Sequence, residues 1–138
     1  IIRGLHDSLR ATSIAITENE ILLGAGTIHS QMANSVREAS ESEPGRARLA
    51  MEAFARALET IPATLVENSG GESLDRILEL RTASRENDIP MGINIEGFVT
   101  PTKDVWHPRS VIEASLESAT ETAMSMLRID QVISSRGD

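Results

Sequence analysis

The chain has 138 residues, of which 40% are hydrophobic but only 2% are aromatic, so it is long enough for one domain with an aliphatic core. Thirteen basic residues stand against 21 acidic ones, and the resulting net charge of −8 excludes binding to the backbone of a nucleic acid. The lack of cysteine excludes disulfides and thiolate metal sites, and no apolar run reaches the ~20 residues of a membrane span, so we expect a cytoplasmic protein without a membrane partner.

The first elements along the chain are a short strand and a helix. Ile1–Gly4 predicts the strand because β-branched residues precede a glycine. Leu5–Thr17 predicts the helix, since its leucines and Ile16 fall on one stripe at helical spacing. Asp7 lies in the expected first turn, where a carboxylate complements the helix dipole. On these local grounds Asp7 is a helix-start carboxylate and no more.

A turn of small residues comes next. Ile21–Leu23 predicts a short strand, and a helix is expected at Ile28–Ala39 with Thr27 as its N-cap. Between them lie Gly24, Ala25 and Gly26. Small residues at a helix N-terminus let backbone N–H groups approach an anion closely, although the pattern alone is weak because such turns are common.

The most regular stretch is Leu49–Gly71, which predicts an amphipathic helix. Its apolar residues recur at steps of three and four and share one face: Met51, Phe54, Ala55, Leu58, Ile61 and Leu65. Charged residues such as Glu59 are expected to face solvent. Pro62 predicts a kink or a restart, because proline lacks the N–H of a helix interior, and the double glycine predicts a left-handed end.

A further helix is expected from Ser73 to about Arg85, followed by a short strand at Met91–Ile95. This strand lies at a glycine turn that includes Gly92 and Asn94. Both residues tolerate left-handed backbone angles, so a purely structural turn explains them at least as well as a binding role on local grounds.

The last third of the chain begins with its least regular stretch, Phe98–Pro108. A helix is expected from Arg109 to about Leu127, and Arg128–Ile133 alternates with period two, which predicts an edge strand. The three histidines have no ligand spacing, so no metal site is expected within this chain.

Four segments together resemble the group II chaperonins, which are the archaeal thermosome and its eukaryotic cytosolic relatives. The longest is EAFARALETIPATLVENSG at Glu52–Gly70, which resembles a long helix of the equatorial domain. The others are LHDSL at Leu5–Leu9, LLGAG at Leu22–Gly26 and SATETAMSMLRIDQVI at Ser118–Ile133. The resemblance therefore covers nearly the whole chain.

This resemblance implies a mainly α fold, a multi-helix equatorial-domain-like bundle with two or three short β-strands. Residues 1–4 would be a remnant strand of the apical and intermediate region, and residues 5–138 the C-terminal portion of the equatorial, ATP-binding domain. Helix stripes on Leu9, Met32, Phe54 and Leu116 are expected to form the core. An apolar face would remain where the family's N-terminal helices pack, and such a face drives association.

The resemblance also implies an ATP site. Asp7 falls where the family carries the catalytic aspartate that orients the water attacking the γ-phosphate. Gly24–Gly26 matches a glycine run that lies against the nucleotide, with Ala25 in place of the middle glycine, while Gly92 and Asn94 match a turn beside the adenine and ribose. The implied cofactors are ATP or ADP with Mg²⁺. The family's G-D-G-T-T metal loop does not occur here, so the metal ligands are expected outside this chain.

The chain departs from the family pattern in two places. Leu5 follows Gly4 at once, whereas the family has further residues between them, so either this chain has a deletion or the sequence joins segments that are separate in a parent protein. The segment after Trp106 is also shorter. His107 there stands nearest to the family's acidic residue on the ribose hydroxyls, and a histidine cannot accept both hydrogen bonds as a carboxylate does.

We therefore expect part of an ATP-dependent group II chaperonin subunit that assists protein folding and contributes one wall of the ATP site and ring contacts. The full subunit would be an ATPase, whereas this chain alone is expected to be inactive. The implied partners are the homo- or hetero-oligomeric ring subunits, and unfolded proteins bound through an apical domain that is not present here. The alternative is a truncated, non-catalytic chaperonin-like module for oligomerisation or scaffolding.

Overall fold

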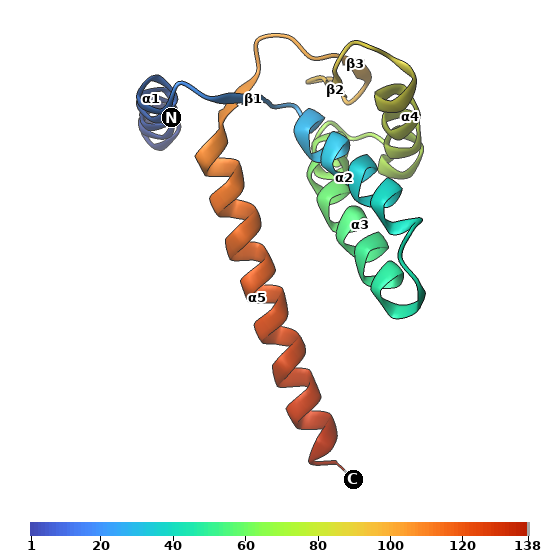
Figure 1. Cartoon of the computed structure of the whole chain (residues 1–138). Coiled ribbons are helices and arrows are strands. Elements are labelled where there is room, and N and C mark those ends of the chain that lie inside the picture. The colour runs from blue at the N-terminus through green and yellow to red at the C-terminus, as the bar shows by residue number, and fades with distance from the viewer. Residues whose placement is uncertain (138) are drawn as a thin grey trace. The chain divides into compact units, whose positions relative to one another are not determined.

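A computed structural model describes residues 1–137, which form five α-helices and four strands of three residues each. The chain divides into two compact units, one made of Ile1–Ile21 with the chain from His107 onward, the other of Leu22–Trp106. Figure 1 traces the chain through both units. The predicted mainly α fold is confirmed, with one more strand than the two or three expected.

The first unit contains α1 (Ile2–Glu18) and α5 (Arg109–Ser135). The C-cap of α1 is Asn19, which has a left-handed φ of 57° and donates its N–H to the carbonyl oxygen of Ala15. α1 buries no residue and α5 buries Ile112. None of the helices within residues 1–137 has the length and apolar character needed to cross a bilayer.

The strand expected at Ile1–Gly4 is wrong, because Arg3 and Gly4 lie in the first turn of α1. A hydrogen bond of 3.0 Å from the Leu5 amide to the Ile1 carbonyl oxygen closes that turn. The helix predicted from Leu5 thus extends one turn toward the N-terminus. Asp7 consequently lies in the second turn, away from the helix-start position that its local interpretation assumed.

The edge strand expected at Arg128–Ile133 is also wrong, because α5 continues through it. Ile129, Val132 and Ile133 have the i, i+3, i+4 spacing of a helix as well as part of a period-two pattern. Six residues are too few to separate the two periods, and the long helix that precedes them extends at little cost.

The second unit is built on α2 (Thr27–Ser40), α3 (Gly45–Asn68) and α4 (Ser73–Glu86), which pack against one another. All three predicted helices are confirmed, although α3 begins before the expected Leu49. α3 runs without interruption through Pro62, so the predicted restart does not occur. The left-handed end of α3 is confirmed by a φ of 83° at the first residue of the double glycine.

The face that α3 buries matches the predicted one only in part, since Ala55 and Leu58 are buried as expected. Phe54, Ile61 and Leu65 are exposed, whereas Glu59, expected in solvent, is only 6% exposed. Ala55 is fully buried, as is Ala33 on α2. Small side chains at this interface let the two helices approach closely, and the large side chains of Phe54, Ile61 and Leu65 remain exposed within this unit.

Two arginines explain why Glu59 is buried. Arg37 on α2 donates Nη1 and Nη2 to the two carboxylate oxygens of Glu59, at 2.6 and 2.5 Å. Arg81 on α4 donates Nε and Nη2 to the same oxygens, at 3.1 and 2.9 Å. Burial raises the pKa of the Glu59 carboxyl, but the hydrogen bonds and charges of Arg37 and Arg81 outweigh it, so this pKa lies below its usual value. One ionised carboxylate therefore joins α2, α3 and α4.

A β-hairpin carries part of the core of the second unit. β2 (Met91–Ile93) pairs antiparallel with β3 (Val99–Pro101), with Ile93 opposite Val99. Ile93 packs in a buried cluster with Val66 of α3 and Leu80 of α4. The core expected from the stripes on Leu9, Met32, Phe54 and Leu116 is wrong, since all four side chains are exposed or half-buried.

A second two-stranded sheet pairs β1 (Ile21–Leu23) with β4 (Trp106–Pro108). β1 was predicted, whereas β3 and β4 both lie in the stretch that the sequence marked as irregular. Trp106 in β4 is 52% exposed. The chain enters the second unit through β1 and leaves it through β4, and the turn that precedes α2 follows β1 directly.

Candidate functional site

The turn before α2 has a distinctive backbone. Ala25 and Gly26 have left-handed φ angles of 56° and 74°. The Thr27 amide donates to the Gly24 carbonyl oxygen at 3.0 Å, and the Gly24 amide donates to the Val105 carbonyl oxygen at 2.8 Å. Gly26 is the N-cap residue, so the predicted cap at Thr27 is off by one. These two hydrogen bonds fix the backbone of the turn directly before α2.

Gly92 in β2 packs against this turn without room for a side chain. A Cβ on Gly92 would lie 2.5 Å from the hydroxyl oxygens of both Thr27 and Thr102, and 2.8 Å from the Ala25 carbonyl oxygen. The two threonine hydroxyls bond to each other at 2.5 Å. The Ile93 amide donates to the Ala25 carbonyl oxygen at 2.8 Å. Two segments far apart in the sequence are thus joined through their backbones.

Asn94 ends β2 and shapes the tip of the hairpin. Its side-chain oxygen accepts hydrogen bonds from the amides of Glu96 and Phe98, at 3.1 and 2.9 Å. Gly97 completes the turn with a left-handed φ of 82° and donates its amide to the Asn94 carbonyl oxygen at 3.0 Å. Asn94 thus has a structural role in the turn through its side-chain oxygen, and not through the left-handed angle that local reasoning expected, because its φ is not positive. The same turn fixes the position of Asn94 beside the neighbouring cavity.

A cavity of about 260 Å³ lies beside these segments, and Ala25, Gly92 and Asn94 are all part of its wall. Three residues that the resemblance assigned to one nucleotide thus lie around one hollow, although they come from opposite ends of the second unit. Gly24 and Gly26 flank Ala25 in the turn. This volume is close to the lower end of the range of small-molecule pockets, which fits one part of a nucleotide better than a whole one.

The rest of the wall comes from residues that sequence analysis missed. Thr100, Thr102 and Lys103 line the cavity from β3 and the loop after it, and Ile95 and Val105 add apolar surface. Lys103 is the only lysine of the chain. Its place in an irregular, proline-containing stretch gave no periodic signal, and its rarity was the one feature that could have drawn attention to it.

Two further predicted residues belong to the other unit. Asp7 lies on an exposed part of α1, and His107 lies in β4 at the start of that unit's second segment. Neither residue lines the cavity of the second unit. The structure gathers Ala25, Gly92 and Asn94 at one cavity, and the role of Asp7 stays a prediction.

The cavity wall suits a ligand that has an apolar ring and polar groups at the edge of that ring. Ile93, Ile95 and Val105 provide apolar surface, and the Thr100 hydroxyl and the Lys103 ammonium group provide donors. The wall contains no carboxylate, which is the ligand that Mg²⁺ prefers, so it does not fit that ion. Within residues 1–137 no group of three or more histidines and carboxylates could hold a metal.

Comparison with protein families gives one match along nearly the whole chain. Residues 1–137 match the model described as the TCP-1/cpn60 chaperonin family. The chain is 38% identical to thermosome subunit beta of Archaeoglobus fulgidus over 99% of its own length and 26% of the relative's. It is also 38% identical to the thermosome subunit of Methanocaldococcus jannaschii, over 96% of its own length and 25% of the relative's. The chain therefore spans about a quarter of the length of these relatives.

Comparison with solved structures agrees with the sequence match. An open-state monomer of a group II chaperonin from Methanococcoides burtonii superposes with a TM-score of 0.80 and 29% sequence identity. The superposition covers 91% of this chain and 32% of that one. The arrangement of helices and short strands is thus that of a segment from a much longer protein.

Proposed function

This chain belongs to the TCP-1/cpn60 chaperonin family, on the group II side of it, and we propose that it forms one wall of the ATP site in a chaperonin subunit. The family membership confirms the resemblance on which the site residues were assigned. The cavity beside the turn before α2 would hold the base and ribose of the nucleotide. Because the chain covers a quarter of its relatives, the remaining walls would come from other parts of the subunit.

The observation that carries this proposal is the convergence of Ala25, Gly92 and Asn94 on one cavity. They come from separate motifs, and a shared nucleotide site requires that these motifs meet at one hollow, as they do. The hydrogen bond from the Ile93 amide to Ala25 holds the two segments together. A site built from a glycine turn and a strand end is rigid, which lowers the entropic cost of binding.

The chain's own residues would take separate roles in this site. The backbone of Gly24–Gly26 would lie against the nucleotide, and Lys103 would offer a positive charge to its phosphates. Asp7 would orient the attacking water as the catalytic carboxylate. Mg²⁺ would neutralise phosphate charge when bound, and its protein ligands would lie outside this chain, because the cavity wall has no carboxylate.

Ring assembly and substrate folding are further parts of the proposal. Apolar side chains such as Leu127, Ile129 and Ile133 are exposed along α5, and Phe54 and Ile61 are exposed on α3. Surfaces of this kind favour contact with the rest of the subunit or with neighbouring ring subunits. Unfolded proteins would be bound by an apical domain outside this chain, in the cytoplasm. The alternative, a non-catalytic scaffold module, draws no support from relatives that are thermosome subunits.

The test is ATP binding and hydrolysis by the protein that carries this chain. Asp7→Ala should keep ATP binding and lower the hydrolysis rate by about 100-fold or more, while the exposed Asp88→Ala should leave both unchanged. Lys103→Gln should weaken ATP binding several-fold, and Arg85→Gln, which removes one exposed charge elsewhere in the same unit, should not. Normal hydrolysis by Asp7→Ala would overturn the catalytic assignment. Equal effects of Lys103→Gln and Arg85→Gln would overturn the cavity as the nucleotide site.

A further inference from the structure

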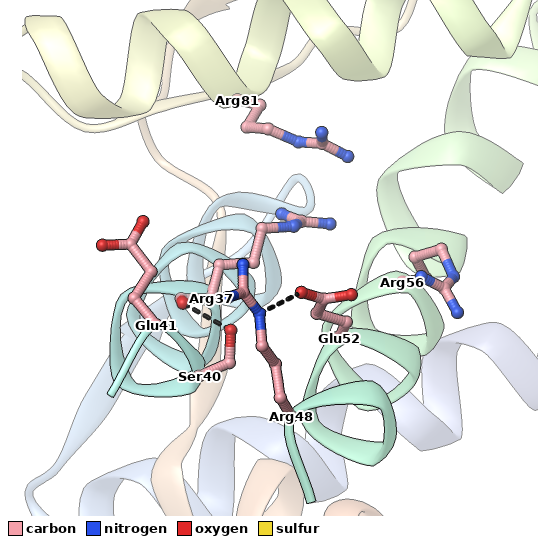
Figure 2. A pocket seen from close by; sticks show the side chains of 7 residues that line it. All are labelled: Arg37, Ser40, Glu41, Arg48, Glu52, Arg56 and Arg81. Carbon is pink, nitrogen blue, oxygen red and sulfur yellow. Dashed lines mark hydrogen bonds and ion pairs between the residues drawn. The ribbon is translucent and has the colours of Figure 1, made fainter. Parts of the chain in front are cut away.

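A second cavity, of about 280 Å³, is lined by four arginines (Figure 2). Arg37 reaches it from α2, Arg48 and Arg56 from α3, and Arg81 from α4. The chain has 13 basic residues and a net charge of −8. Nearly a third of its cations thus gather at one hollow of an otherwise acidic protein. We call this hollow, defined by the four arginines, the arginine pocket.

Carboxylates around the arginine pocket do not balance its charge. Glu59 neutralises part of the pair Arg37 and Arg81, as described above. Glu52 accepts a hydrogen bond of 2.9 Å from Arg48 Nε, and Glu41 also lines the pocket. These four arginines and three carboxylates leave one positive charge in excess. Arg56 forms no ion pair with any residue in the range 1–137 that the structure describes.

The arginines also retain hydrogen-bond donors. Each guanidinium group carries five N–H groups. Glu59 accepts from two nitrogens of Arg37 and two of Arg81, and Glu52 accepts from one nitrogen of Arg48. All four arginines therefore keep N–H groups that these carboxylates do not occupy. Because Arg37 and Arg81 are already held by Glu59, less side-chain entropy is lost when they bind a ligand.

We propose that the arginine pocket binds the phosphate group of a small molecule, separately from the nucleotide cavity. A phosphate has three or more acceptor oxygens in a tetrahedral array and carries nearly two charges, so guanidinium groups that approach from three helices can share it. A single carboxylate has two coplanar oxygens, and such a group already occupies the Arg37 and Arg81 pair as Glu59. The pocket's residues come from α2, from Glu41 directly after it, and from α3 and α4, whereas the nucleotide cavity is lined by the turn before α2, the hairpin and the loop after β3.

Arginine footprinting on the protein that carries this chain tests the proposal without any substitution. Phenylglyoxal would be reacted with the protein in saturating ADP, which fills the proposed nucleotide site, with and without pyrophosphate as the probe. Mass spectrometry of peptides would give the modification rate of each arginine. Pyrophosphate should slow modification of Arg56 at least fivefold and leave the exposed Arg46 and Arg85 unchanged. An unchanged rate at Arg56 would overturn the proposal, as would equal slowing at all three residues.

Two controls separate phosphate binding from other causes. Sodium chloride at the same ionic strength should not protect Arg56, and protection equal to that of pyrophosphate would mean simple charge screening and would overturn the proposal. A glutamate-rich peptide that protects Arg56 better than pyrophosphate would also overturn it, in favour of an acidic polypeptide as the occupant.

A matched pair of variants gives an independent measurement by calorimetry. Arg56→Gln and Arg46→Gln each remove one exposed charge from α3, but only Arg56 lines the pocket. In saturating ADP, Arg56→Gln should weaken pyrophosphate binding at least fivefold, while Arg46→Gln should leave it unchanged. Equal affinities in the two variants would contradict the proposal.

Discussion

Gly26 and Pro62 are in direct contact, so that the start of α2 rests on the proline inside α3. A Cβ on Gly26 would lie 2.7 Å from Cβ of Pro62 and 3.0 Å from its Cα. Pro62 is among the largest fully buried side chains. Gly26 also has a left-handed φ of 74°. Glycine is therefore required at this position by both its backbone angle and its surroundings.

Gly26→Ala should lower the free energy of unfolding by more than ~3 kcal/mol, because it adds a steric clash to the strain of a left-handed residue. Gly70→Ala is the matched control, since Gly70 has a φ of 83° but a Cβ there would meet nothing within 4 Å. Gly70→Ala should lower the free energy of unfolding by only about 1–2 kcal/mol. Urea unfolding followed by circular dichroism measures both. Equal losses in the two variants would show that the contact with Pro62 adds nothing.

Glu59→Gln should lower the free energy of unfolding by about 2–3 kcal/mol, because the remaining amide leaves two partly buried arginines without their counter-charge. The control is Glu52→Gln, which breaks the more exposed pair with Arg48. An exposed i,i+4 pair contributes about 0.5 kcal/mol or less. The same urea experiment compares them, and a loss no larger for Glu59→Gln than for Glu52→Gln would contradict a stabilising role of the ion pairs between Glu59 and the two arginines.

Stability should fall in acid through the same carboxylate. The pKa of Glu59 is lower in the folded chain than its ordinary value of 4.5, so the folded state binds this proton less readily than the unfolded state. The contribution of Glu59 is therefore complete above the ordinary pKa and is lost as the pH falls through the lowered folded value. Thermal unfolding from pH 6 downward would show this loss in the wild type. The same profile in Glu59→Gln should be flatter, and identical slopes would contradict the assignment.

Ala25→Gly should raise the free energy of unfolding by up to about 1 kcal/mol. Ala25 has a left-handed φ of 56°, which glycine adopts without strain, and this gain exceeds the extra entropy that glycine loses on folding. Ala47→Gly, at an exposed position in α3, makes the same chemical change in a regular helix and should instead cost about 1 kcal/mol. Urea midpoints of the two variants should move in opposite directions.

The helices of the second unit could be predicted from sequence because their signals are local. Spacing, proline and glycine positions fixed α2, α3 and α4 to within a few residues. The inward face of α3 could not be predicted in this way. Periodicity places Glu59 on the solvent face of the helix. Its burial is favourable only because Arg37 and Arg81, which belong to other helices, donate hydrogen bonds to its carboxylate. Such a contact depends on packing that no local pattern contains.

The candidate site was predictable in part for a related reason. Motif resemblance identified Ala25, Gly92 and Asn94, which do line one cavity. It did not identify Thr100, Thr102 or Lys103, because these belong to a hairpin arm and loop without periodicity. The structural role of Asn94 also required coordinates, since its hydrogen bonds to the hairpin tip depend on the turn geometry.

The exposed indole of Trp106 gives this chain an intrinsic fluorescence probe at a single position. Trp106 is the only tryptophan, there is no tyrosine, and it follows directly after Val105 in the cavity wall. Because the ring is half in water in the folded state, we expect its emission to change little when the helices melt. We expect the same emission to respond to a ligand that shields or displaces the segment next to the cavity. Fluorescence of this chain should therefore follow the state of its cavity better than the state of its core.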